Sequence, residues 1–92
     1  MTLRELCERR NNMNNTTEEE RTGLSILEFY VDKLENAKEY KTMAYASDTI
    51  NGFLLGLRMT EYINKKEYEA LRKNKESYEN DFFWQNKRRI TY

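Results

Sequence analysis

The residues whose side chains are best suited to binding lie at the end of the sequence, over residues 81–92. Phe82, Phe83 and Trp84 are consecutive aromatic residues, and a basic run without an acid follows them. Such side chains dominate the energetics of protein interfaces, and they also stack on bases and pair with phosphates. The segment therefore predicts a protein-binding anchor or a nucleic-acid contact, with a membrane surface as the least favoured contact. A purely structural interpretation stands beside these: Phe82 and Trp84 fold back and complete a small core.

Helical register limits how these rings can be used. Successive residues of a helix are about 100° apart, so three consecutive aromatic residues cannot share one face. At least one ring should therefore point away from the domain. The predicted partner-binding residues are Tyr78, Phe82, Phe83, Trp84, Lys87, Arg88 and Arg89.

The sequence holds few residues that could carry out catalysis. It has no histidine, one cysteine and no Gly-rich phosphate loop. Histidine is the commonest general base and metal ligand, and a single cysteine cannot form a structural zinc site. Cys7 lies in an apolar helical pattern, which predicts a buried thiol. We therefore expect a protein that is not an enzyme and that has no catalytic residue, metal or cofactor.

Length and charge narrow the class of partner. A chain of 92 residues suits one domain, residues 1–92, with a core small enough to favour a homodimer. The net charge is zero, whereas nucleic-acid-binding proteins are usually basic. The charge is uneven, because residues 1–63 carry 8 basic and 11 acidic residues and residues 64–92 carry 8 and 5. This asymmetry favours a basic patch near the C-terminus.

The N-terminal segment MTLRELCERR is polar and charged, which does not resemble a signal peptide. No apolar run approaches the roughly 20 residues that a membrane-spanning helix needs. We expect a cytoplasmic protein that does not bind membranes.

Helix start signals indicate the fold class. Thr2 with Glu5 forms a capping box that predicts a short helix over Leu3–Arg10, followed by the flexible connector NNMNNTT, so that residues 1–16 form one part. Thr17 with Glu20 forms a second box and opens a helical core over residues 17–80. Residues 81–92 form the aromatic-basic tail. These signals predict an all-α fold, a small bundle of three to four helices with a helical hairpin and a capped C-terminal helix.

Two apolar stripes in residues 24–61 are out of phase. Leu27 and Leu34 belong to the first stripe, and Met43, Ile50 and Leu54 belong to the second. The nine residues from Leu34 to Met43 correspond to about 900° of rotation, which leaves the stripes half a turn apart. We favour two helices with a break in residues 36–42. The alternative is one long helix that buries opposite faces at its two ends.

Gly52 and Gly56 lie four residues apart in the most apolar stretch, so they share one side of a helix. A glycine costs roughly 1 kcal/mol in a helix interior, which suggests that both permit a close approach of another helix. We predict a helix–helix contact at these two residues.

The turn before the last helix has the clearest local pattern. Asn64 and Glu67 form a third capping box, and Ile63 with Tyr68 occupies the two positions of a hydrophobic staple. The following helix is expected to run into the late seventies.

An apolar helix, a short turn and the capped segment INKKEYEAL resemble the C-terminal half of many small helical proteins encoded by phages and prophages of AT-rich Gram-positive bacteria. They also resemble short C-terminal modules in which an I-T-x-x-E-[FY] turn precedes the last helix. The likeness covers Ile50–Leu71, and Glu61 with Tyr62 replaces the usual glycine before the turn. Such phage proteins bind and inhibit or redirect host proteins, anti-defence inhibitors among them.

These observations predict a non-catalytic protein-binding module. The resemblance implies an inhibitor or modulator of a host protein, of the anti-defence type, encoded by a mobile element. The less favoured alternative is a small nucleic-acid-binding regulator that uses the C-terminal aromatic-basic segment.

Overall fold

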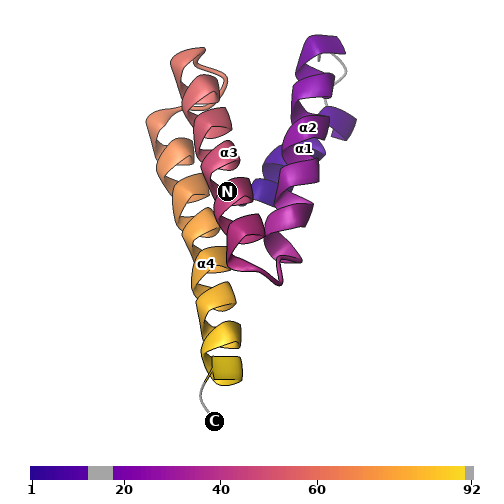
Figure 1. Cartoon of the computed structure of the whole chain (residues 1–92). Coiled ribbons are helices and arrows are strands. Elements are labelled where there is room, and N and C mark those ends of the chain that lie inside the picture. The colour runs from indigo at the N-terminus through magenta and orange to yellow at the C-terminus, as the bar shows by residue number, and fades with distance from the viewer. Residues whose placement is uncertain (13–17, 91–92) are drawn as a thin grey trace.

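The computed structural model describes residues 1–12 and 18–90, with side chains for all of them except residues 10–12, 19–21 and 86–90. The elements are α1 (Leu3–Asn12), α2 (Glu18–Glu35), α3 (Tyr40–Met59) and α4 (Lys65–Ile90) (Figure 1). The described residues contain no strand. The predicted all-α bundle is therefore confirmed. α1 extends two residues beyond the predicted Leu3–Arg10, and the connector residues 13–17 lie outside the description.

The core lies at the contacts between the four helices. α2 packs chiefly on α1 and α3, and α3 packs on α4, while α1 and α2 touch α4 at fewer points (Figure 1). The apolar stripes read from the sequence supply this core, because one face of each helix must be removed from water. Its buried apolar residues are Leu3, Leu6, Cys7, Leu24, Leu27, Val31, Leu34, Met43, Ala46, Ile50, Leu54, Ile63, Leu71 and Phe82.

The hairpin predicted for residues 24–61 is confirmed. α2 ends at Glu35 and α3 begins at Tyr40, inside the predicted break. The Asn36 side-chain amide donates to the Asp32 carbonyl oxygen at 2.9 Å, which satisfies one of the last carbonyls of α2. No glycine or proline forms this turn. Reversing the chain there allows two out-of-phase stripes to face the same core.

Two of the three predicted capping boxes are present with both of their hydrogen bonds. The Glu5 N–H donates to Thr2 Oγ1 at 3.1 Å, and the Thr2 N–H donates to Glu5 Oε1 at 3.1 Å. The Glu67 N–H donates to Asn64 Oδ1 at 2.8 Å, and the Asn64 N–H donates to Glu67 Oε1 at 3.0 Å. Thr17 of the second predicted box lies outside the described residues, and α2 begins directly after it at Glu18.

The end of α3 adopts a Schellman motif without glycine. The Tyr62 N–H donates to the Leu57 carbonyl at 3.0 Å, and the Glu61 N–H donates to the Arg58 carbonyl at 3.2 Å. This pattern requires a left-handed residue after the helix, and Glu61 has φ of 63°. An L-residue with a side chain pays roughly 1–2 kcal/mol for this conformation. The turn therefore forms with Glu61 in a conformation that glycine adopts more easily.

Replacing Glu61 with glycine is expected to raise the free energy of unfolding by about 0.5–1 kcal/mol, because relief of the left-handed strain outweighs the added entropy of the unfolded chain. Urea unfolding followed by circular dichroism measures the change. The matched control is Glu69→Gly at an exposed position inside α4, which should lower stability by about 1 kcal/mol. A loss of stability in Glu61→Gly would show that the Glu61 side chain itself stabilises the turn.

α4 is longer than expected from the sequence. It continues through the predicted tail to Ile90, rather than ending in the late seventies. The helix projects beyond the turn between α2 and α3, so its last turns extend past the bundle (Figure 1). Residues 81–90 of the predicted aromatic-basic tail therefore belong to this helix. Among the described helices, none has the length and apolar character needed to cross a membrane.

Candidate functional site

The three consecutive aromatic residues of α4 divide between the core and the surface. Phe82 is 7% exposed, whereas Phe83 is 51% and Trp84 is 66% exposed. The Phe83 ring lies 6.2 Å, centroid to centroid, from the ring of Tyr40 at the start of α3. We call the three exposed residues Tyr40, Phe83 and Trp84 the aromatic tip. The helical geometry that predicted at least one outward ring is confirmed.

Two of the predicted partner-binding residues, Tyr78 and Phe82, make contacts inside the bundle. Phe82 belongs to the core, and Tyr78 is half-buried with its hydroxyl donating to Glu35 Oε1 at 2.9 Å. Phe82 is buried in the core, so its assignment to a partner-binding surface is corrected. Tyr78 is only partly buried, and its assignment stays a prediction, as do those of the exposed Phe83 and Trp84.

The predicted basic residues follow the aromatic tip along the same helix. Lys87, Arg88 and Arg89 lie in the last turns of α4, and their side chains are outside the described part of the structure. Helical register places position 87 one turn beyond Phe83 and position 88 one turn beyond Trp84.

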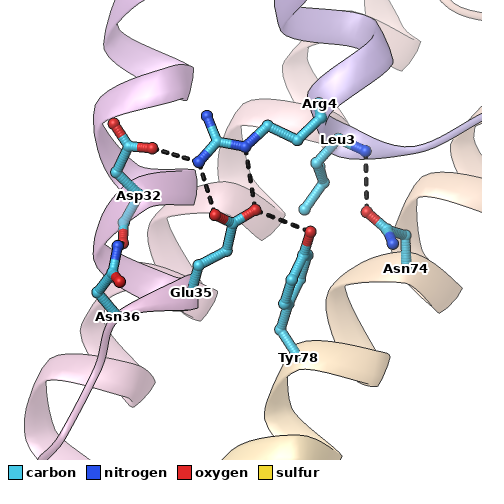
Figure 2. Close-up of polar contacts among 7 residues, drawn as sticks. All are labelled: Leu3, Arg4, Asp32, Glu35, Asn36, Asn74 and Tyr78. Atoms are coloured by element: carbon cyan, nitrogen blue, oxygen red, sulfur yellow. Dashed lines mark hydrogen bonds and ion pairs between the residues drawn. The ribbon is translucent and has the colours of Figure 1, made fainter.

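A cluster of polar contacts centred on Arg4 joins α1, α2 and α4 (Figure 2). The Arg4 guanidinium of α1 donates to Asp32 and to both oxygens of Glu35 on α2, the latter at 2.6 and 3.0 Å. Tyr78 of α4 donates to the same Glu35 carboxylate (Figure 2). Separately, the Leu3 N–H donates to Asn74 Oδ1 of α4 at 2.9 Å. These contacts hold α1 and α2 against α4.

The charges in this cluster stabilise one another. The hydrogen bonds from Arg4 and, to a lesser extent, from Tyr78 lower the pKa of Glu35, against the opposing effect of burial. The same carboxylates raise the pKa of Arg4. Burial, followed by the hydrogen bond to Glu35, raises the pKa of Tyr78. The tyrosine therefore stays protonated as a donor, and the cluster acts as a structural clamp rather than as an acid–base pair.

A second polar cluster lies between α3 and α4. Lys75 is 5% exposed, and its Nζ donates to Ser47 Oγ at 2.8 Å and to Glu79 Oε1 at 2.7 Å. Ser47 donates to the same glutamate oxygen at 2.7 Å. A serine beside a lysine resembles a nucleophile with its base. Here the lysine donates to a carboxylate, and the serine is buried, so the geometry supports a structural ion pair.

Gly52 and Gly56 do not form the predicted contact within the chain. Both are exposed, and a Cβ built on either residue meets no atom within 4 Å. They lie on the side of α3 that faces away from the buried stripe through Ile50 and Leu54, because residues two or six positions along a helix are displaced by about 200–240°. The prediction is therefore wrong for packing inside the bundle. A homodimer through this face stays a prediction.

Replacing Gly52 with alanine is expected to raise the free energy of unfolding by about 0.5–1 kcal/mol, because alanine restricts the unfolded chain and the added methyl group meets no neighbour. Chemical denaturation measures the effect, and Ala44→Gly in the same helix is the opposite control. Light scattering at several concentrations should accompany it. A loss of stability together with a loss of dimer mass would show that a second copy approaches Gly52 closely.

Sequence reasoning missed Tyr40, which completes the aromatic tip from a different helix. Its only signal was an aromatic residue off the apolar stripe of α3, and its proximity to Phe83 depends on how α3 packs on α4. Comparison with known proteins adds no relative: the chain matches no family model, no curated protein and no solved structure. Among the described residues, no group of three or more His, Cys, Asp and Glu side chains could hold a metal ion.

Proposed function

We propose that this chain is a non-catalytic protein-binding module that docks on an acidic surface of another protein through its aromatic tip. Following the resemblance to small phage proteins, the proposed partner is a host protein that the module inhibits or redirects in the cytoplasm, as an anti-defence protein would.

The observation that carries the proposal is the exposure of Phe83 and Trp84 in the C-terminal part of α4. Exposing large aromatic rings forgoes the free energy that burial would provide, and clustered exposed rings are typical of interaction sites. Tyr40 enlarges the cluster, and residues 87–89 add three positive charges along the helix. A rigid helix that carries rings beside cations suits an interface hot spot that also attracts an acidic partner.

A nucleic-acid contact is the second candidate, because stacking rings beside Lys and Arg also suit single strands. The net charge of the chain is zero, whereas nucleic-acid-binding proteins are usually basic. This supports a protein partner over a nucleic acid. Binding to random DNA and RNA, measured from about 50 to 200 mM salt, separates the two, since a nucleic-acid binder loses affinity steeply over this range.

The test of the proposal is capture of the partner from a lysate of the native host, with identification by mass spectrometry. Phe83→Ala/Trp84→Ala should abolish the captured protein while helical content is retained. The matched control is Leu55→Ala/Met59→Ala, which removes two exposed apolar side chains from α3 and should leave capture unchanged.

Equal capture by the tip variant and by the unaltered chain would overturn the proposed use of the aromatic tip. Micromolar or tighter binding to random nucleic acid, lost with salt and with the tip substitutions, would replace the proposed protein partner with a nucleic acid.

A further inference from the structure

A groove runs along the junction between α2 and α3. It consists of two adjoining hollows of about 600 and 340 Å³ that share Phe29, Lys33 and Thr42. We call it the α2–α3 groove and define it by Phe29, Tyr30, Lys33, Lys41, Thr42 and Tyr45.

Aromatic rings from both helices line this groove. Phe29 meets Tyr30 edge-on at 5.3 Å between ring centroids, and Tyr30 lies 6.0 Å from Tyr45. Phe29 is 55% exposed and Tyr45 is 65% exposed. The three rings form a continuous apolar surface that crosses from α2 to α3 and remains open to solvent.

The charges around the groove are mostly positive. Two acids, Asp32 and Glu39, lie along it, and Arg4 engages the Asp32 carboxylate from α1. Because Arg4 is shared between Asp32 and Glu35 (Figure 2), it offsets the charge of Asp32 only in part. The Nζ atom of Lys33 lies 5.3 Å from the ring centroid of Phe29. The lysines that line the two hollows are Lys33, Lys38 and Lys41.

We propose that the α2–α3 groove binds an acidic, amphipathic peptide segment of a partner protein. Apolar side chains of the segment would cover the exposed rings, and its carboxylates would pair with the three lysines, which outnumber the two acids of the groove, Asp32 and Glu39. Recognition of an amphipathic segment by an apolar groove with complementary rim charges is a common mode of peptide binding. This site adds a second contact surface to the proposed protein-binding function and uses residues separate from the aromatic tip.

The test titrates the full-length, ¹⁵N-labelled chain with a synthetic helix-forming peptide of about 16 residues built from Glu and Leu. Saturable chemical-shift changes should concentrate on Phe29, Lys33, Thr42 and Tyr45. A matched peptide with Lys in place of Glu should not bind, and one with Gln in place of Leu should bind at least about tenfold more weakly, because both the charge and the apolar face are required.

Variants of the chain assign the contact. Lys33→Glu/Lys41→Glu should weaken peptide binding by at least about tenfold, through reversed charge at the rim. The control Lys65→Glu/Lys66→Glu makes the same change in net charge at exposed positions of α4 and should alter binding less than about twofold. Thermal unfolding of each variant verifies that the fold is intact.

Three results would overturn the groove proposal: no saturable binding at about millimolar peptide, equal weakening by the control pair, or shifts confined to Phe83 and Trp84. Self-association of the unaltered chain that Lys33→Glu/Lys41→Glu abolishes would instead assign the groove to a second copy. Phe83→Ala/Trp84→Ala should leave peptide affinity unchanged. Failure of the aromatic tip and failure of the groove are therefore distinguished by different variants.

Discussion

Replacing Phe82 with alanine is expected to lower the free energy of unfolding by about 3 kcal/mol, whereas Phe83→Ala should change it by less than about 0.5 kcal/mol. The two residues are adjacent and chemically identical, but Phe82 is buried in the core and the Phe83 ring is half-exposed. Truncating the buried ring removes its transfer free energy and leaves a cavity. Urea unfolding followed by circular dichroism measures both variants.

The same pair separates stability from binding. Phe82→Ala should weaken partner capture only to the extent that it unfolds the chain, so capture should recover at lower temperature. Phe83→Ala should weaken capture of a fully folded protein. Equal losses of stability in both variants would show that the aromatic tip closes the core and that partner binding must be sought elsewhere.

Replacing Glu79 with alanine is expected to lower the free energy of unfolding by about 3 kcal/mol, which is the second of the large effects. The change leaves the ammonium group of Lys75 buried between α3 and α4 without its carboxylate. Removing one partner of a buried ion pair is costly because the remaining charge was taken out of water and has lost its compensation. Thermal and chemical unfolding measure the loss.

Replacing the whole cluster with apolar residues is the decisive control. In Ser47→Ala/Lys75→Met/Glu79→Leu no buried charge remains, and the expected stability is within about 1 kcal/mol of the unaltered protein, because well-packed apolar side chains often equal a buried ion pair. If this variant is as unstable as Glu79→Ala, packing rather than charge compensation accounts for the loss.

The cluster also predicts how stability depends on pH. Burial raises the pKa of Glu79, but the hydrogen bonds from Lys75 and Ser47 together lower it by more than burial raises it. The net shift of the Glu79 pKa is therefore downward. A carboxylate with a lowered pKa contributes stability above its unfolded pKa of about 4.3 and loses it as pH falls through the folded value. The apolar triple variant should therefore lose less stability than the unaltered protein between about pH 6 and pH 3.

Local physics determined much of this protein from the sequence. Capping boxes require only neighbouring residues, so Thr2 and Asn64 marked helix starts that the structure contains. The apolar stripes identified the buried faces for the same reason, since helical period places their residues on one side. Register alone also required that Phe82, Phe83 and Trp84 could not all face the core.

Packing between distant segments decided the rest. Nothing local distinguishes Phe82 from Phe83 as the buried ring, because that choice depends on where α2 and α3 meet α4. Gly52 had the spacing of a packing residue, but the helices that could contact it lie on the other side of α3.

Polar residues show the limit most clearly. Lys75 carries a charge, yet its side chain is buried, and Ser47 and Glu79 accept its hydrogen bonds there. The α2–α3 groove likewise depends on how two helices pack, and Arg4, 28 residues from Asp32, contacts that acid beside the groove. Burial and charge compensation are properties of contacts between helices, and sequence patterns within one helix do not contain them.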